Sequence, residues 1–230
     1  MATVAGVDGC RRGWVAVVLR DGRFASADTY VEFADVLAAM RTAGCAAVGV
    51  DMPVGLLDEG TRECERAARE LLKRASGTVF PMPPRAVLEA PTHADALKRC
   101  RQLGIPGVSA QGYALRTKIS QVERALADGA PFSFPVLEIH PELAFLAMNG
   151  GVPLESKKTW NGFWTRARVL RERNIELPER LDGARGAVPD DVLDAAAVAW
   201  SAARYERGDA VSLPAEPQTG PNGEEIAIWF

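Results

Sequence analysis

The sequence is poor in the residues that build disulfide frameworks and metal–thiolate sites. It has four cysteines in 230 residues, widely spaced and without a C-x-x-C pair. This spacing argues against a zinc ribbon, a redox motif and a disulfide scaffold. No apolar run approaches the roughly 20 residues of a membrane span, and the N-terminus lacks the basic-then-apolar layout of a signal peptide. We therefore expect a reduced, cytoplasmic protein that does not associate with membranes.

The motifs of several common enzyme classes are also missing. The chain contains no G-x-x-x-x-G-K-[ST], which excludes a P-loop, and no H-E-x-x-H or G-x-S-x-G. The glycines of "GVDGCRRG" are wrongly spaced for a dinucleotide-binding loop. The net charge is −3. It counts mildly against tight nucleic-acid binding, because proteins that grip phosphates are usually basic.

The apolar segments that are present predict an α/β protein. Three strands are expected first, at residues 4–7, 14–20 and 23–30. Asp21-Gly22 is a strong hairpin signal between the last two, so these three strands are expected to form an antiparallel meander. A helix over 31–41 and an apolar fourth strand over 46–51 follow.

The middle of the chain, about residues 61–130, has a helical pattern, and the next strand is expected over 134–142. Two helices, 159–173 and 189–207, and an edge strand at 225–230 complete the prediction. We interpret residues 1–230 as a single domain with a helical insertion. Its mixed sheet would have three antiparallel strands followed by parallel strands.

Two expected strands each end in an aspartate, Asp8 and Asp51, and the last helix carries Asp191 and Asp194 on one face. Strand ends in an α/β sheet converge on the crevice that binds ligands. Clustered carboxylates repel one another unless a hard cation such as Mg²⁺ or Mn²⁺ neutralises them. An acid can also cap a turn or interact with the helix dipole, and the dipole explains Asp190 better. Because Asp8, Asp51, Asp191 and Asp194 occur together in this pattern, we favour a metal site.

A second group of ionisable residues lies in "EIHPE". On a strand, Glu138, His140 and Glu142 would share one face. His140 could serve as a general acid or base, or as a ligand. We favour a catalytic role for Glu138 and His140, whereas Glu142 is better explained as the start of a helix after Pro141.

One segment, residues 155–173, combines cations with aromatic rings, as nucleic-acid-binding segments do. An ordinary amphipathic helix, with its aromatics in the core and its arginines in solvent, explains the helical part slightly better. Lys157 and Lys158, in the loop before it, are the better candidates for contacting phosphate. Arg85, in the proline-stiffened "PMPPR", could present its guanidinium to an oxyanion or brace the insertion.

Six motifs in order carry a family resemblance: "GVDGCRRGWVAVV", "VGVDMPVGL", "VFPMPPR", "EIHPELAF", "SKKTWNGF" and "DDVLDAAAVAW". Over about residues 4–207 the chain resembles domain-of-unknown-function family 429, described as predicted nucleases of the ribonuclease H fold. The resemblance implies a ribonuclease H-like mixed sheet. Asp8, Asp51, Asp191 and Asp194 match the acid pattern of the Holliday-junction-resolvase branch, with one departure: this branch usually has Glu at the position of Asp51.

These observations favour a metal-dependent nuclease that uses Mg²⁺ or Mn²⁺ and acts on nucleic acid. One alternative is a phosphotransferase or ATPase similar to actin and the sugar kinases, although 230 residues leave little room for the two lobes of that superfamily. The other is a non-catalytic binding domain, which the acidic charge and Asp51 support. The sequence leaves the oligomeric state open, with a homodimer among the options.

Overall fold

The computed structural model describes residues 2–129 and 132–230, so the first residue of the chain and the last of the predicted insertion, residue 130, lie outside the described residues. Its main sheet has the strand order β3-β2-β1-β4-β5. The strands are β1 (Thr3–Cys10), β2 (Gly13–Arg20), β3 (Arg23–Tyr30), β4 (Ala47–Val50) and β5 (Val136–Glu138). The first three pair antiparallel, and β4 runs parallel to both β1 and β5. This mixed α/β sheet has the arrangement expected of a ribonuclease H-like fold.

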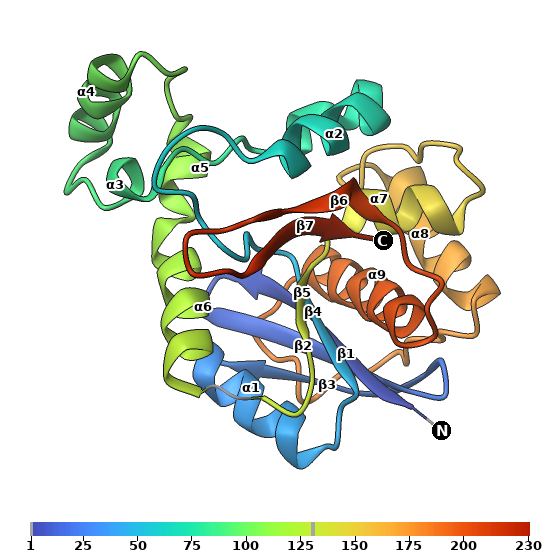
Figure 1. Cartoon of the computed structure of the whole chain (residues 1–230). Helices are drawn as coiled ribbons and strands as arrows, with labels where there is room; N and C mark the ends of the chain where they lie inside the picture. Colours follow the sequence, from blue (N-terminus) through green and yellow to red (C-terminus); the bar gives the residue numbers. More distant parts are fainter. Residues whose placement is uncertain (1, 130–131) are drawn as a thin grey trace.

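Helices cover both faces of this sheet (Figure 1). On one face, α1 (Phe33–Thr42) and α6 (Arg116–Gly129) pack on alternate side chains of the central strands, such as Ala5 and Val7 of β1. On the other face lies α9 (Pro189–Glu206), whose alanines pack against Val4, Val15 and Val17. The apolar strand patterns thus reflect burial on both faces.

The approach of α9 to the sheet is unusually close because two strand residues are glycines. A Cβ atom added to Gly6 would lie 2.1 Å from both the carbonyl oxygen of Ala195 and the amide nitrogen of Ala199. One added to Gly49 would lie 2.5 Å from the Ile139 side chain and 2.8 Å from that of Val198. Backbone therefore packs nearly on backbone where α9 crosses β1, and this sets the position of the α9 side chains relative to the strand ends.

The segment between β4 and β5 is helical, as predicted. It contains α2 (Glu63–Leu72), the 3₁₀ helix η1 (Lys73–Thr78), α3 (Arg85–Leu88), α4 (His93–Leu103), α5 (Ala110–Ala114) and α6. The last of these packs beside α1 on the sheet, whereas α3 and α4 extend away from it (Figure 1). That the chain forms one domain with an insertion stays a prediction.

Two predicted strands differ from the observed ones. The strand expected over 134–142 is shorter, because α7 (Pro141–Met148) begins at its proline and the His140 side chain caps that helix. The C-terminal edge strand is present as β7 (Glu225–Trp229), but it pairs with β6 (Ser212–Thr219) in a separate two-stranded sheet. The sequence pattern did not indicate β6, whose prolines are typical of edge strands. Among the described residues we find no helix long and apolar enough to span a membrane.

Candidate functional site

Three of the four predicted aspartates meet at one edge of the sheet. Asp8, Asp51 and Asp194 each place a carboxylate oxygen within 4.8 Å of the other two. We call these residues the acid triad. Asp8 is 8% exposed and Asp194 only 3%. Three oxygen donors at this separation are a donor set that suits a hard divalent cation.

The fold brings these acids together from three elements. Asp8 lies near the end of β1 and Asp51 directly after β4, and the two strands are parallel neighbours. The backbone N–H of Asp51 donates to the Val7 carbonyl at 2.9 Å, which continues the pairing up to the acid. The N–H of Gly9 donates to Oδ1 of Asp8 at 2.6 Å. Asp194 reaches the strand ends from α9, next to the close contact at Ala195.

Burial and mutual repulsion make the acid triad resist ionisation. Burial, reinforced by the charges of Asp51 and Asp194, raises the pKa of Asp8 well above its ordinary value. Burial also raises the pKa of Asp51 and that of Asp194 to about 7, although the Lys157 ammonium lowers both. Without a cation, the site therefore holds protons near neutral pH.

This property predicts that the metal-free protein becomes less stable as the pH rises. Between pH 4 and 7, roughly, the folded protein binds protons on Asp51 and Asp194 that the unfolded chain has already lost, so the free energy of unfolding falls as the pH rises through this window. Burial lowers the pKa of His140, which opposes the trend below about pH 6.5. In EDTA we expect a higher Tm at about pH 6.5 than at about pH 8. An unchanged or rising Tm over that interval contradicts the prediction. Added Mn²⁺ should weaken the decrease of Tm with pH, because the carboxylates must be deprotonated to bind it.

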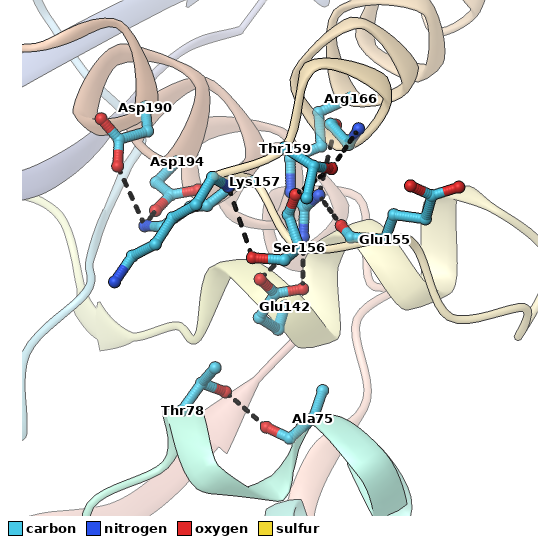
Figure 2. A network of polar contacts seen from close by, with 12 residues as sticks. Ala75, Thr78, Glu142, Glu155, Ser156, Lys157, Thr159, Arg166, Asp190 and Asp194 are labelled. Atoms are coloured by element: carbon cyan, nitrogen blue, oxygen red, sulfur yellow. Dashed lines mark hydrogen bonds and ion pairs between the residues drawn. The ribbon is translucent and has the colours of Figure 1, made fainter.

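Lys157 is the cation closest to the acid triad. Its ammonium is hydrogen-bonded to Asp194 and lies 3.9 Å from Oδ2 of Asp190. Figure 2 shows it reaching from the loop before α8 (Trp160–Glu172) toward α9. Lys157 was predicted to contact phosphate; the structure places its ammonium against the Asp194 carboxylate, and the phosphate contact stays a prediction.

A buried arginine anchors the loop that carries Lys157. Arg166, on α8, is 1% exposed and donates through Nη2 to both carboxylate oxygens of Glu142 at 2.8 Å. Its Nη1 also donates to the carbonyl of Glu155 (Figure 2). These charge-assisted bonds tie α8 and the backbone of Glu155 to α7, so a buried contact holds the loop two residues before Lys157.

The fourth predicted ligand, Asp191, lies outside the acid triad. Its Oδ2 accepts the N–H of Val188 at 3.2 Å at the start of α9. Its charge still contributes to the raised pKa of Asp8, so it is near the site electrostatically. The alternative explanation for acids at this helix start, stabilisation of the first turn, accounts for the contact that Asp191 makes.

Glu138 is buried in an ionic group that links β5 to the insertion. Arg62 donates to Glu138 through Nη2 and to Glu65 through Nη1 at 2.6 Å, and all three side chains are buried. The N–H of Val54 also donates to Glu138 at 2.8 Å. Burial raises the pKa of Glu65 to about 7 despite Arg62. The carboxylate of Glu138 is therefore already engaged by these donors.

His140 and Glu142 form the start of α7. Nδ1 of His140 accepts the N–H of Glu142 at 3.3 Å, and its Nε2 lies 3.4 Å from the Thr78 carbonyl. With Nδ1 as the acceptor, the proton of a neutral imidazole would lie on Nε2, and burial lowers the pKa of His140, which favours that neutral form. The expected strand alternation is wrong at Glu142. This residue lies in the first turn of α7, as its alternative explanation, the start of a helix after Pro141, predicted.

Two other predicted binding residues are not brought to the acid triad. Arg85 pairs with Glu123 of the insertion at 2.8 Å and with Asp58, just before the insertion, at 3.4 Å, which are contacts of the bracing kind. Lys158 is exposed, and within the described part of the chain it makes no ion pair. Lys158 follows the loop residue that reaches the site, but its own side chain is not engaged there.

A pocket of about 200 Å³ opens beside the acid triad. Its polar lining includes Lys118 of α6, which the sequence analysis missed. The Lys118 ammonium donates to the Gly13 carbonyl and lies 4.4 Å from the centre of the Trp14 ring. Apolar side chains of the insertion and of neighbouring segments complete the lining. They include Met52, Phe80, Met82 and Leu115. Lys118 sits in an ordinary amphipathic helix pattern, so no local signal could have identified it.

The helix α8 reverses the expected pattern of its side chains. Trp160 is 76% exposed and Trp164 is 52% exposed, whereas Arg166 is buried. The prediction that the aromatics of this helix lie in the core and its arginines in solvent is therefore wrong at these three positions. Phe163 alone of the three aromatics packs against the core.

Comparison with known proteins gives a family but no characterised relative. No curated protein and no solved structure matches the chain. Residues 6–219 match the family described as "protein of unknown function (DUF429)". The match includes all three members of the acid triad and nearly the whole of the described fold, and the chain therefore belongs to the DUF429 family.

Proposed function

We propose that the protein is a nuclease that hydrolyses phosphodiester bonds of nucleic acid with the help of a divalent metal ion, Mg²⁺ or Mn²⁺. The observation that carries this proposal is the convergence of Asp8, Asp51 and Asp194 within 4.8 Å at the edge of a ribonuclease H-like sheet. Buried carboxylates that repel one another fit a hard cation, which would remove the repulsion when it binds.

Each residue of the site has a defined task in this proposal. A bound divalent cation would neutralise charge on the phosphate and lower the pKa of a water ligand. Asp8, Asp51 and Asp194 would hold the cation through one carboxylate oxygen each. Lys157, already at Asp194, would contact a phosphate oxygen and add a second positive charge as negative charge develops. Glu138 would hold the insertion in place through Arg62, and His140 would cap α7.

The test is cleavage by the full chain on a panel of labelled substrates: single strands, duplexes, branched DNA and RNA–DNA hybrids. We expect product fragments with Mn²⁺ or Mg²⁺ and none with EDTA. No cleavage of any substrate, with a Tm that Mn²⁺ nevertheless raises, would support the non-catalytic alternative. Stabilisation by ATP with Mg²⁺, but not by the metal alone, would instead support a phosphotransferase.

A further inference from the structure

The outer face of α8 carries a row of exposed side chains that the proposed chemistry does not use. Trp160, Trp164, Arg168 and Arg171 follow one another at helical spacings of four, four and three residues, so they lie along one face. We call them the α8 stripe. All four are exposed, and the rings of Trp160 and Trp164 lie 5.6 Å apart, edge to face. Among the described residues, no other aromatic side chain is both large and comparably exposed.

The charge of the stripe is positive. Arg168 pairs with Glu172 at 2.5 Å, but both side chains are about half exposed, and such surface pairs contribute little. Arg171 makes no ion pair within the residues that the structure describes, and neither does Lys158 at the opposite end of the stripe. Two stacking rings are therefore followed by cations that remain available to phosphates. This combination is typical of surfaces that bind single-stranded nucleic acid.

The stripe begins close in the chain to a residue that contacts the acid triad. Lys157, which contacts Asp194, is only three residues before Trp160, so their Cα atoms are at most about 11 Å apart. The bond of Arg166 to Glu142 fixes α8 against α7, and α8 also packs on α9, which carries Asp194. The helix that carries the stripe is thus held on the two elements that lie next to the carboxylates.

We propose that the α8 stripe binds unpaired bases of a single-stranded nucleic acid and directs the adjoining phosphate to the acid triad. Unpaired bases expose the ring faces that Trp160 and Trp164 can stack on, whereas the bases of a duplex already stack on each other. Arg168 and Arg171 would follow the strand's backbone away from the site. This inference rests on the proposed nuclease function and names its substrate class, single strands or single-stranded segments.

The test compares the full chain with a Trp160→Leu/Trp164→Leu variant and a matched Trp160→Phe/Trp164→Phe variant. Leucine keeps apolar bulk but removes the stacking face, which phenylalanine retains. Affinity for a labelled oligonucleotide is measured by fluorescence anisotropy in EDTA, where no cleavage is expected. We expect the leucine variant to bind single strands at least about tenfold more weakly, and the phenylalanine variant to retain most of the affinity. Both should keep the wild-type Tm, because the replaced side chains are exposed.

Each outcome separates this inference from the proposed function. Unchanged single-strand affinity in the leucine variant, or equal wild-type affinity for a duplex of the same sequence, overturns the role of the stripe even if the protein cleaves nucleic acid. A wild-type dimer in light scattering that becomes a monomer in the leucine variant also overturns it, because the stripe is then an interface between two copies. Binding that depends on the two tryptophans, with no cleavage in the presence of any metal ion tested, supports binding by the stripe and refutes the proposed nuclease activity.

Discussion

Asp8→Asn is expected to abolish metal-dependent cleavage while making the metal-free protein more stable. Asparagine has the shape of aspartate and its Oδ1 can still accept the N–H of Gly9, but it removes a buried carboxyl group whose ionisation is opposed by burial and by the charges of Asp51 and Asp194. Relief equal to one pKa unit is about 1.4 kcal/mol, which raises the Tm of a chain of this size by about 3–6 °C. Cleavage should fall about a thousandfold or more, since a cation contributes several kcal/mol to phosphoryl transition states.

Metal binding gives this prediction a second readout. Mn²⁺ at a hundred times its dissociation constant would stabilise the wild-type protein by about 2.7 kcal/mol, and the variant should gain much less. Asp35→Asn is the matched control, because Asp35 is an exposed acid in the first turn of α1 and is not a member of the acid triad. It should leave cleavage and the response to Mn²⁺ unchanged. An Asp8→Asn protein that still cleaves, or that is less stable than wild type in EDTA, is incompatible with a repelling metal-binding triad.

The central sheet could be predicted because its signals are local. The Asp21-Gly22 turn has φ values of 50° and 74°, which are the left-handed values that the hairpin signal requires. Asp8 and Asp51 could be placed at one sheet edge because each ends an apolar run, and parallel strands end at the same edge. The position of Asp194 was predicted from a helix with an alanine-rich side that looked able to pack on the sheet.

Contacts between distant segments could not be predicted in this way. Glu138 finds its guanidinium partner at Arg62, 76 residues earlier in the chain, and neither residue's neighbours indicate this pairing. Asp191 and Asp194 share the same spacing signal, yet only one of them joins the triad, since the side chain of Asp191 turns back to the backbone of Val188. Spacing along a helix defines a face, but the choice between a backbone donor and a shared cation depends on the tertiary structure.

The exposed tryptophans show a related limit. Hydrophobic spacing in α8 is compatible with either side facing the core, and the side that does so carries Val169 and Leu170 together with Arg166. Its guanidinium is held by Glu142 and by the Glu155 carbonyl, so the side bearing Trp160 and Trp164 is left in solvent. Arginine is rarely buried in a helix. A sequence pattern therefore predicts that Arg166 faces solvent and that the tryptophans face the core.

Gly6→Ala is expected to cause the second large effect, because α9 and β1 touch through their backbones at this residue. The added Cβ would lie 2.1 Å from main-chain atoms of Ala195 and Ala199, which cannot rotate away as a side chain can. The helix must therefore move from the sheet and lose part of the apolar contact that its alanines make. We expect the free energy of unfolding to fall by about 3 kcal/mol or more, at the upper end for overpacked cores, as measured by urea denaturation.

The same displacement should weaken metal binding, since Gly6 is two residues from Asp8 and Ala195 follows Asp194 directly. A helix moved outward carries Asp194 away from the two strand-end acids, so the Tm increase with Mn²⁺ should shrink in whatever protein remains folded. Gly77→Ala is the matched control: Gly77 is exposed, its φ is not positive, and no atom lies within 4 Å of its added Cβ. If Gly6→Ala were as stable and as responsive to Mn²⁺ as Gly77→Ala, α9 could not be packed this closely on β1. The acid triad thus depends on a residue without a side chain as much as on its own carboxylates.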